Sequence, residues 1–473
     1  MTRHQPSLRH ADLGEAFFDK VRPASFPQHV LRYRNRRWAE RVGLDGLSDA
    51  EWITYFGRFE PLPGSFPQPL ALRYHGHQFR SYNPDLGDGR GFLFAQLHDL
   101  QDDRLLDLAT KGSGRTPWSR GGDGRLTLKG GVREILATSM LEALGVDTSK
   151  SFSLVETGED LVRGDEPSPT RSSVLVRLSH SHIRIGTFQR LAFLEETDNL
   201  RRLVDHTIAT YRPALWVEDP AARTAALLED AALSVARTGA QWIAAGFVHG
   251  VLNTDNINIT GESFDYGPWR FLPHYDPGFT AAYFDESGLY AFGRQPDALA
   301  WNLTRLAECL VPLAEIDALE AALNRFWPAF RIELAHAMLA RLGLTPIDEE
   351  TDNRFVTALF EFLSASQAPY EQFFFDWRGG ALSAARAASS PAQAFYLHPS
   401  FEALANLLEA YLPSPGVNLD HPYFARTTPR TMLIEDVEAL WAPIAEHDDW
   451  SAFTAVLAEI EQMRQAYAGA TPT

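Results

Sequence analysis

The chain has 473 residues, of which 45% are hydrophobic and 12% aromatic, with 43 Lys and Arg against 61 Asp and Glu. This composition is typical of a folded globular protein and excludes intrinsic disorder and collagen-like repeats. The net charge of −18 argues against a general nucleic-acid or anionic-membrane surface, which needs a basic face, but permits a local basic pocket for phosphates.

The sequence also predicts where the protein is found. Its longest uncharged stretch, Thr238 to Thr254, contains Gln, His and Asn and is too short and too polar to span a bilayer. The first twenty residues include several charges and no apolar core, which is unlike a secretory signal. Cys309 is the single cysteine, and its apolar helical context predicts a small buried side chain. We therefore expect a cytoplasmic protein without membrane or nucleic-acid partners.

Two kinds of pattern divide the chain. Between about residues 70 and 190, short β-type runs (91–97, 105–111, 151–157 and 172–178) are interrupted by one expected helix, 132–145. From about residue 195, amphipathic patterns dominate, and the clearest is 220–246, with Asp219 as N-cap. Further helices are expected at 297–313, 316–342, 352–365, 400–412, 432–445 and 450–468.

This order predicts an α+β protein with a cleft between a strand-rich N-lobe and a large helical C-lobe, the usual place for a nucleotide. We expect four segments. They are an N-terminal extension packing on the lobes (1–69), a nucleotide-binding N-lobe (70–194), a helical C-lobe with catalytic and metal loops (195–344) and a C-terminal helical extension (345–473).

Glycine-rich segments are the first candidates for a phosphate site. In LGDGRGFLFAQL, Gly87, Gly89 and Gly91 alternate just before an expected strand, and glycines let a backbone approach a phosphate. A plain Asp-Gly hairpin turn is the alternative, although Arg90 between the glycines adds a positive charge. Asp123–Gly124 is a second Asp-Gly pair, either a turn or another nucleotide-contacting loop.

A lysine and a glutamate form the next candidate pair. Lys111 ends an apolar strand-like run, and Glu134 follows 23 residues later in the first turns of the expected helix. In protein kinases a strand Lys neutralises phosphate oxygens and a helix Glu orients it. The alternative is that both are ordinary surface charges.

Two arginines follow in the next strand. On one straight strand, Arg177 and Arg184 would face opposite sides, so they converge only if the chain turns at residues 179–182. Two guanidinium groups would then suit a polyphosphate. The histidines nearby lack further ligands at matching spacing and are not predicted to hold a metal; they are His180, His182 and His206.

The strongest local signal follows the 220–246 helix. A polar loop contains Asp255 and Asn256, and a short apolar strand is expected before Asp265. Asn256 and Asp265 offer oxygens that suit Mg²⁺, while Asp255 is free to accept a proton from a hydroxyl. A plain helix-to-strand turn is the alternative. Together with the Gly loop, Lys111 and Glu134, the order of these groups predicts a protein-kinase-like bilobal fold.

The catalytic segment departs from ordinary kinases, because no Asp follows His249 and Asp-Tyr-Gly stands at 265–267. The chain instead resembles the selenoprotein O family of protein adenylyltransferases over roughly residues 70 to 300, and more loosely at PRTMLIEDVEALW (429–441). The resemblance rests on HGHQF (75–79), LGDGR (86–90), KGSGRTPWSRGGDGR (111–125), VRE (132–134), Arg177 with Arg184, and HGVLNTDN with FDYGP (249–268).

The resemblance implies a kinase-like fold that binds ATP in a flipped orientation and transfers AMP to Ser, Thr or Tyr hydroxyls of proteins. It assigns proton abstraction to Asp255 and metal binding, with Mg²⁺ or Mn²⁺, to Asn256 and Asp265. The nucleotide-binding residues it implies are Gly87, Gly89, Arg90, Lys111 (oriented by Glu134), Asp123, Gly124, Arg177, Arg184 and Asp265. A kinase that transfers the γ-phosphate, or a catalytically inactive nucleotide-binding scaffold, are the alternatives. A monomer is expected.

The chain differs from the family pattern at two places, and each difference leads to a further expectation. LKGGVRE has two glycines where the family more often has Ser, which is expected to loosen the start of the Glu134 helix. Many members also carry a selenocysteine or Cys redox pair near the C-terminus. This chain has neither there, so no gating through such a pair is expected.

Overall fold

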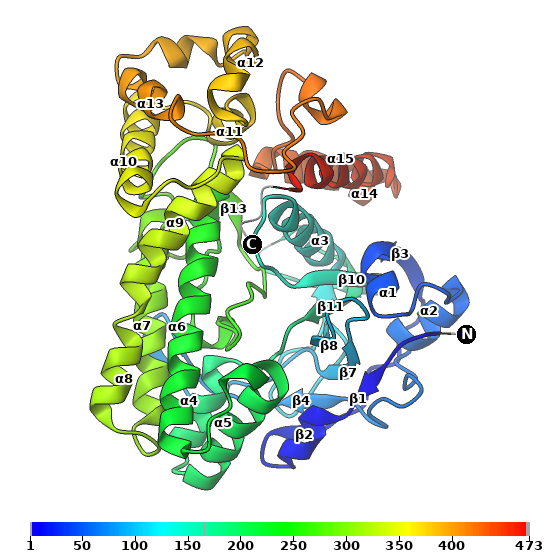
Figure 1. Ribbon diagram of the computed structural model, residues 1–473. Coiled ribbons are helices and arrows are strands. Elements are labelled where there is room, and N and C mark those ends of the chain that lie inside the picture. Colours follow the sequence, from blue (N-terminus) through cyan, green and yellow to red (C-terminus); the bar gives the residue numbers. More distant parts are fainter. Residues whose placement is uncertain (1, 165, 470–473) are drawn as a thin grey trace.

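The computed structural model describes residues 2–164 and 166–469. It confirms the α+β class: a large antiparallel sheet lies beside a stack of long helices (Figure 1). The main path of the sheet runs β2-β4-β7-β8-β11-β10-β3, with β1 on β7 and β9 on β11. Its strands are β1 (Pro6–Ser7), β2 (Phe18–Lys20), β3 (Val30–Arg34), β4 (Leu70–Leu72), β7 (Leu93–His98), β8 (Leu105–Lys111), β9 (Leu126–Thr127), β10 (Lys150–Leu161) and β11 (Thr170–Ser179).

Four of these strands match the β-type runs of the sequence. β7, β8, β10 and β11 fall on 91–97, 105–111, 151–157 and 172–178, and β10 extends further, to Leu161. The segment before residue 70 supplies strands of its own, since β2 pairs with β4 and β3 pairs with β10. The N-terminal segment is therefore part of the sheet.

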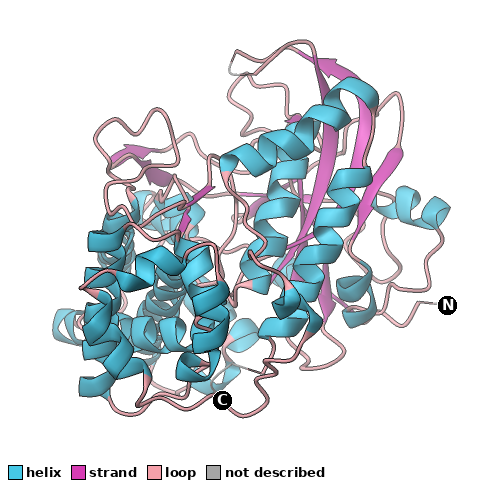
Figure 2. Ribbon diagram, turned by 90° about the horizontal axis from the view of Figure 1, so that it is seen from above, coloured by secondary structure: helices cyan, strands magenta, loops and turns pink. Residues whose placement is uncertain are grey.

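Alternate side chains of the strands enter two different cores. Leu154 and Leu175 face the core that contains α3 (Leu128–Ala143). Val174 and Val176, on either side of Leu175, pack in the other core with the apolar residues of α1 (Arg36–Arg41) and α2 (Asp49–Phe56). The period of two along each strand thus places a helical layer on both faces of the sheet, as Figure 2 shows for the helices that lie over the strands.

The helix predicted at 132–145 begins four residues earlier. Thr127 caps it by accepting a hydrogen bond from the backbone N–H of Gly130. A Cβ at Gly131 would lie 2.4 Å from Leu154 Cδ1, so this glycine lets the helix approach the sheet closely. The two glycines that were expected to loosen the start of this helix lie inside its capped first turn.

The helical part follows β11. The 220–246 prediction is confirmed by α6, but the single helix expected at 316–342 is two helices that break at Asn324 and Arg325. The bounds are α4 (Ile185–Phe193), α5 (Thr197–Tyr211), α6 (Pro220–Ala244), α7 (Gln295–Leu310), α8 (Ile316–Leu323), α9 (Phe326–Leu342), α10 (Glu349–Ser366), α11 (Tyr370–Asp376), α12 (Ala384–Ser389), α13 (Phe401–Leu408), α14 (Ile434–His447) and α15 (Ser451–Tyr467).

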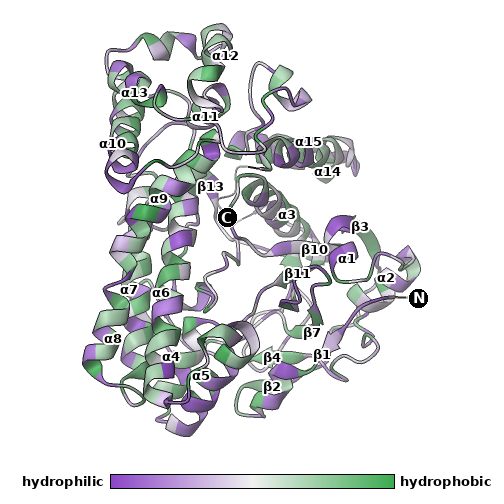
Figure 3. Cartoon of the chain, in the orientation of Figure 1, coloured by the Kyte–Doolittle hydropathy of each residue, from purple (hydrophilic) through white to green (hydrophobic). Residues whose placement is uncertain are grey.

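These helices are amphipathic, with green apolar and purple polar positions mixed along each ribbon in Figure 3. Cys309 of α7 is buried, as predicted. Within residues 2–164 and 166–469, no helix is both long and apolar enough to cross a membrane.

The last two helices return to the N-terminal half. In Figure 1, α14 and α15 lie next to α3. Lys129 Nζ at the start of α3 lies 2.8 Å from Glu438 Oε2 of α14, and α15 buries Phe453, Val456 and Ile460 in the same core as α3. The C-terminal helices therefore cover the side of α3 that the sheet leaves free.

Candidate active site

The centre of the candidate site is a four-residue ion-pair network. Lys111 Nζ, at the end of β8, lies 2.7 Å from Glu134 Oε2 of α3 and 2.9 Å from Asp265 Oδ1. Arg177 Nη1 of β11 lies 2.9 Å from the same Asp265 oxygen and 3.4 Å from Glu134 Oε1. The surface-charge alternative for Lys111 and Glu134 is wrong, because both are buried, with 5% and 0% of their surface exposed.

The sheet brings these residues together. β11 pairs with β8 so that Arg177 lies opposite Ala109 and Leu175 opposite Lys111, which places the Lys and Arg side chains on the same region of the sheet face under α3. Glu134 points down from that helix between them. The result is the Lys–Glu pair that orients phosphates in protein kinases, here with an additional arginine.

Charge neutralisation controls the protonation of Asp265. Burial alone would raise its pKa, but Lys111, Arg177 and Arg184 hold that pKa well below its usual range. The carboxylate is therefore ionised, as a metal ligand must be. Asp265 also has a positive φ of 64°, an uncommon conformation for a residue other than glycine that is found most often at functional sites.

Arg184 reaches the site because the chain turns between the two arginines. Ser181 adopts a φ of 88°, and α4 begins at Ile185, immediately after Arg184. The guanidinium of Arg184 lies 5.4 Å from the centroid of the Phe264 ring, and that of Arg177 lies 5.9 Å from it. The turn at 179–182 thus makes the two arginines converge, as their assignment to one ligand requires.

Asp88 is the partner of Arg184, and sequence reasoning did not single it out. Arg184 Nη1 lies 2.9 Å from Asp88 Oδ1, while Asp88 Oδ2 accepts from the backbone N–H of Leu72 at 3.0 Å. Its position between the candidate glycines Gly87 and Gly89 is the feature of the sequence that could have indicated a functional role. Asp88 holds the Arg184 side chain against the glycine-rich segment.

Asp255 has a different environment. Within the described residues, its buried Oδ1 has no hydrogen-bond partner. Burial raises the pKa of this carboxyl to about 6, helped by the charge of Asp265 and opposed by Arg184. A half-buried carboxylate with a raised pKa and an unpaired oxygen is suited to accept a proton from a substrate.

A small hairpin fixes the catalytic loop. It consists of β5 (Gly76–Gln78) and β6 (Ser81–Asn83). The backbone N–H of His77 donates to Thr254 Oγ1 at 2.7 Å, and Thr254 donates to Gln189 Oε1 at 2.6 Å. A Cβ at Gly76 would lie 3.1 Å from Asp255 Oδ1. The hairpin, which the sequence offered only as the motif HGHQF, therefore lies directly against the proposed base.

The short strand expected before Asp265 is absent. Within residues 257–264, two isolated bridges join Asn258 to Arg184 and Ser263 to Thr148, while β12 (Phe247–Val248) and β13 (Arg270–Phe271) pair on either side of the loop. The polar residues of this segment form local turns instead, for example through Asn258 Oδ1 and the Thr260 N–H. Propensity for a strand is outweighed by this turn chemistry.

The residues expected to bind a metal are Asn256 and Asp265. Asn256 Nδ2 donates to the Val251 carbonyl at 3.1 Å, so the amide oxygen is the atom of Asn256 that could bind a metal ion. One or two protein oxygens, completed by phosphates and water, suit Mg²⁺ or Mn²⁺. Among the residues that the structure describes, no group of three His, Cys, Asp or Glu could hold a metal by itself.

Gly87 and Gly89 have a structural explanation in addition to the proposed nucleotide role. A Cβ on Gly87 would lie 2.4 Å from Trp118 Cγ, and one on Gly89 would lie 2.8 Å from the Trp118 carbonyl oxygen. Both glycines are thus needed to seat Trp118, whose Nε1 donates to Asp19 Oδ2. Arg90 is exposed next to them.

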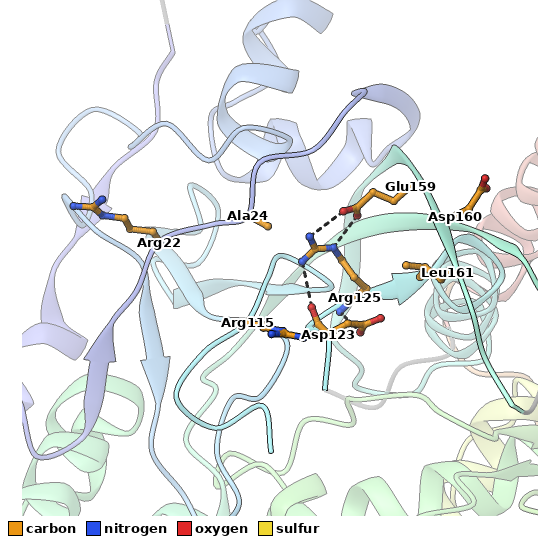
Figure 4. A pocket seen from close by; sticks show the side chains of 8 residues that line it. All are labelled: Arg22, Ala24, Arg115, Asp123, Arg125, Glu159, Asp160 and Leu161. Atoms are coloured by element: carbon orange, nitrogen blue, oxygen red, sulfur yellow. Dashed lines mark hydrogen bonds and ion pairs between the residues drawn. The ribbon is translucent and has the colours of Figure 1, made fainter. Parts of the chain in front are cut away.

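Asp123 lines a pocket whose lining includes none of the four residues of the ion-pair network. Asp123 pairs with Arg163 at 2.8 Å, and Arg125 forms two hydrogen bonds with Glu159, as the dashed lines of Figure 4 show. The cavity measures about 740 Å³, within the range of small-ligand sites. It is lined by Arg22, Ala24, Arg115, Asp123, Arg125, Glu159, Asp160 and Leu161.

A glycine turn connects this pocket to Lys111. Gly124, with a φ of 71°, packs so closely on Gly114 that a Cβ would lie 2.3 Å from the Gly114 carbonyl carbon. Gly112 to Gly114 follow Lys111 directly. The pocket and the ion-pair network are therefore neighbours along one loop.

A family model described as protein adenylyltransferase SelO matches residues 2–461. The chain belongs to this family. It is 45% identical over 471 residues to the protein nucleotidyltransferase YdiU of Gloeobacter violaceus, which covers 97% of this chain and 94% of that protein. The YdiU protein of Synechococcus elongatus is 44% identical over 464 residues (94% and 93%), and that of Vibrio vulnificus is 37% identical over 367 residues (77% and 73%).

SelO membership confirms the resemblance seen in the sequence and extends it over almost the whole chain. The chain is an enzyme, and nucleotidyl transfer is its reaction class.

Proposed function

We propose that this SelO-family enzyme transfers AMP from ATP to Ser, Thr or Tyr hydroxyls of proteins and releases pyrophosphate. The observation that carries the proposal is the convergence of three buried cations. Lys111 and Arg177 contact Asp265, and Arg184 lies against the ring of the adjacent Phe264. A single Lys serves kinases at this position. Three cations match a leaving group that carries two phosphates.

In the proposed reaction, one residue acts on the acceptor hydroxyl and three others act on the leaving group. The acceptor hydroxyl loses its proton to Asp255, and its oxygen forms a bond to the α-phosphorus of ATP. The bond between that phosphorus and the oxygen bridging to the β-phosphate breaks, and pyrophosphate leaves with the electron pair. Lys111, Arg177 and Arg184 stabilise the charge that develops on the leaving group.

The same roles of these residues predict how ATP binds. ATP would lie flipped relative to kinases, with its outer phosphates at the cation cluster. Gly87, Gly89, Arg90, Asp123 and Gly124 would complete the nucleotide site. Mg²⁺ or Mn²⁺, held by Asn256 and Asp265, would neutralise phosphate charge. We also propose that the enzyme is a monomer in the cytoplasm and that it acts only on ATP and proteins.

The test uses ATP labelled on either the α- or the γ-phosphate, incubated with the enzyme, Mg²⁺ or Mn²⁺ and a cell extract. We expect protein-bound label from the α-position only. Label from the γ-position only would establish a kinase and contradict the role of the arginines. Label from neither, with ATP bound, would support an inactive scaffold.

The metal assignment has a separate test. Asp265→Ala should remove the dependence of ATP affinity on Mg²⁺, measured by calorimetry with and without chelator. ATP affinity that responds to Mg²⁺ as in the wild type would refute the metal role of Asp265.

A further inference from the structure

The tip of the β5–β6 hairpin has an unusual sequence for its shape. Gln78 pairs with Ser81, so Phe79 and Arg80 form a two-residue turn, with φ angles of 49° and 66°. Positive φ at both central residues is typical of Asn-Gly or Asp-Gly turns, and it is uncommon for a bulky side chain. The residues at this tip therefore serve something other than the turn itself.

The hairpin and the catalytic loop form one unit. The Phe79 N–H donates to Asn253 Oδ1 at 3.0 Å, and Tyr290 Oη donates to the same oxygen at 2.8 Å. Gly76 lies against Asp255 at the other end of the strand. Asn253 thus joins the hairpin tip, the loop after Asp265 and the loop of the proposed base.

Aromatic side chains from two distant parts of the chain meet at this tip. Phe79 lies 5.0 Å from Tyr290 and 5.8 Å from Phe284, and Phe284 lies 5.1 Å from Tyr283, measured between ring centroids. Phe79, Tyr283 and Phe284 are 36%, 83% and 48% exposed. We name these three residues the aromatic platform. Exposed aromatic groups of this kind are typical of protein-binding surfaces.

The platform lies within reach of a substrate bound at the base. Phe79 is three positions after Gly76, so their Cα atoms lie at most about 11 Å apart. An extended peptide rises about 3.3 Å per residue. A polypeptide with its hydroxyl at Asp255 would bring residues about two to four positions away over the platform.

We propose that the aromatic platform binds the acceptor polypeptide and selects segments with an apolar side chain two to four residues from the modified hydroxyl. This inference rests on the proposed function, since Asp255 defines where the hydroxyl lies. Its continuity with Asp255 through Gly76, Thr254 and Asn253 favours an acceptor segment as the occupant. The turn strain at Phe79 and Arg80 is the independent sign that these side chains are selected for contact.

The first experiment compares two altered platforms with a control. One variant carries Phe79→Asn and Arg80→Gly, which suit the turn and should fold at least as well as the wild type. The other carries Tyr283→Ser and Phe284→Ser. The control is Leu397→Ser, because Leu397 is 84% exposed on the segment between α12 and α13.

We measure the affinity for ATP with Mg²⁺ and the rate at which α-labelled ATP labels proteins of a cell extract. Both platform variants should bind ATP within twofold of the wild type and label proteins at least tenfold more slowly, while Leu397→Ser matches the wild type. Unchanged labelling by both platform variants would overturn the inference. Absence of α-label with the wild type would overturn the proposed function instead.

Two further measurements address the occupant. After modification of a nonapeptide library with a central Ser, Thr or Tyr, wild-type enzyme should enrich Phe, Leu, Ile or Met at least threefold two to four positions from that residue, and the platform variants should not. Equal enrichment by wild type and variants, or no apolar preference, would refute the selection. A wild-type dimer that both variants convert to monomers in sedimentation would identify a self-association surface and also refute it.

Discussion

Asp255 and Asp265 stand ten residues apart at the same site, but their surroundings are opposite. Asp265 contacts Lys111 and Arg177, and its pKa lies well below the usual range. Asp255 has a buried, unpartnered oxygen and a pKa raised to about 6. The Asp265 carboxylate is neutralised by neighbouring cations, whereas the Asp255 side chain is half-buried and one of its oxygens is buried without a partner.

This difference in surroundings corresponds to the proposed roles: Asp265 for binding and Asp255 for proton transfer. A compensated carboxylate contributes stability, and phosphates that enter the site would compete with Asp265 for the same cations. An uncompensated carboxylate destabilises the folded protein but keeps a proton acceptor ready.

The largest effect is expected for the activity of Asp255→Asn. Removal of a general base typically lowers the rate by about 10²- to 10⁴-fold, and ATP affinity should change little because the cation cluster is untouched. Initial rates of α-label transfer, with ATP affinity measured alongside, check this. Transfer at more than a tenth of the wild-type rate would show that another group takes the proton.

A loss of stability is expected for Asp265→Asn. Without this carboxylate, Lys111 and Arg177 share Glu134 as their remaining contact in the network. Because the Asp265 side chain is 28% exposed, we expect a loss of about 1–3 kcal/mol, below the full cost of breaking a buried pair. Urea unfolding of the metal-free protein measures it, and unchanged stability would show that the network contributes nothing to folding.

A gain of stability is expected for Asp255→Asn in the same assay with chelator present. The folded carboxyl has the higher pKa, about 6 against 3.8, so its stabilising contribution is present below pH 3.8 and is lost as the pH rises through 6. At pH 8 the substitution should therefore stabilise the protein by about 1–2 kcal/mol, after allowance for partial exposure. The gain should shrink toward pH 4, and a gain independent of pH would contradict the cause given.

The smallest effect is expected for Gly76→Ala. The added Cβ would lie 3.1 Å from Asp255 Oδ1 and 3.2 Å from Thr254 Oγ1, which displaces the base by a few tenths of an ångström. We expect the transfer rate to fall about three- to tenfold with ATP affinity unchanged, since near-attack geometry is sensitive to such shifts. Gly121→Ala, where no atom lies within 4 Å of the added Cβ although φ is positive, controls for the loss of a glycine.

Local patterns predicted the Lys111–Glu134 pair better than the surroundings of Arg184 and Asp255. Lys111 and Glu134 could be paired from an apolar run and a helix start, because each signal lies within one element. The contact of Arg184 with Asp88 and that of Gly76 with Asp255 depend on long-range packing. No periodicity in the sequence encodes those.

The elements of the fold were also predicted from local patterns. Strands β7, β8, β10 and β11 were predicted because each contains a short apolar run, and α6 because it is long and capped. The break between α8 and α9 and the extended start of α3 were missed. Local signals mark both: Pro328 lies in the first turn of α9, where proline is tolerated but a continuous helix through it is not, and Thr127 caps the start of α3.

The C-terminal helices also change how the Lys111–Glu134 pair can be controlled. In protein kinases, the position of the helix that carries this Glu is what activating partners and modifications adjust. Here α3 is enclosed between the sheet and the chain's own α14 and α15, tied by Lys129 to Glu438. Helices of the same chain therefore hold α3 in the position where Glu134 contacts Lys111.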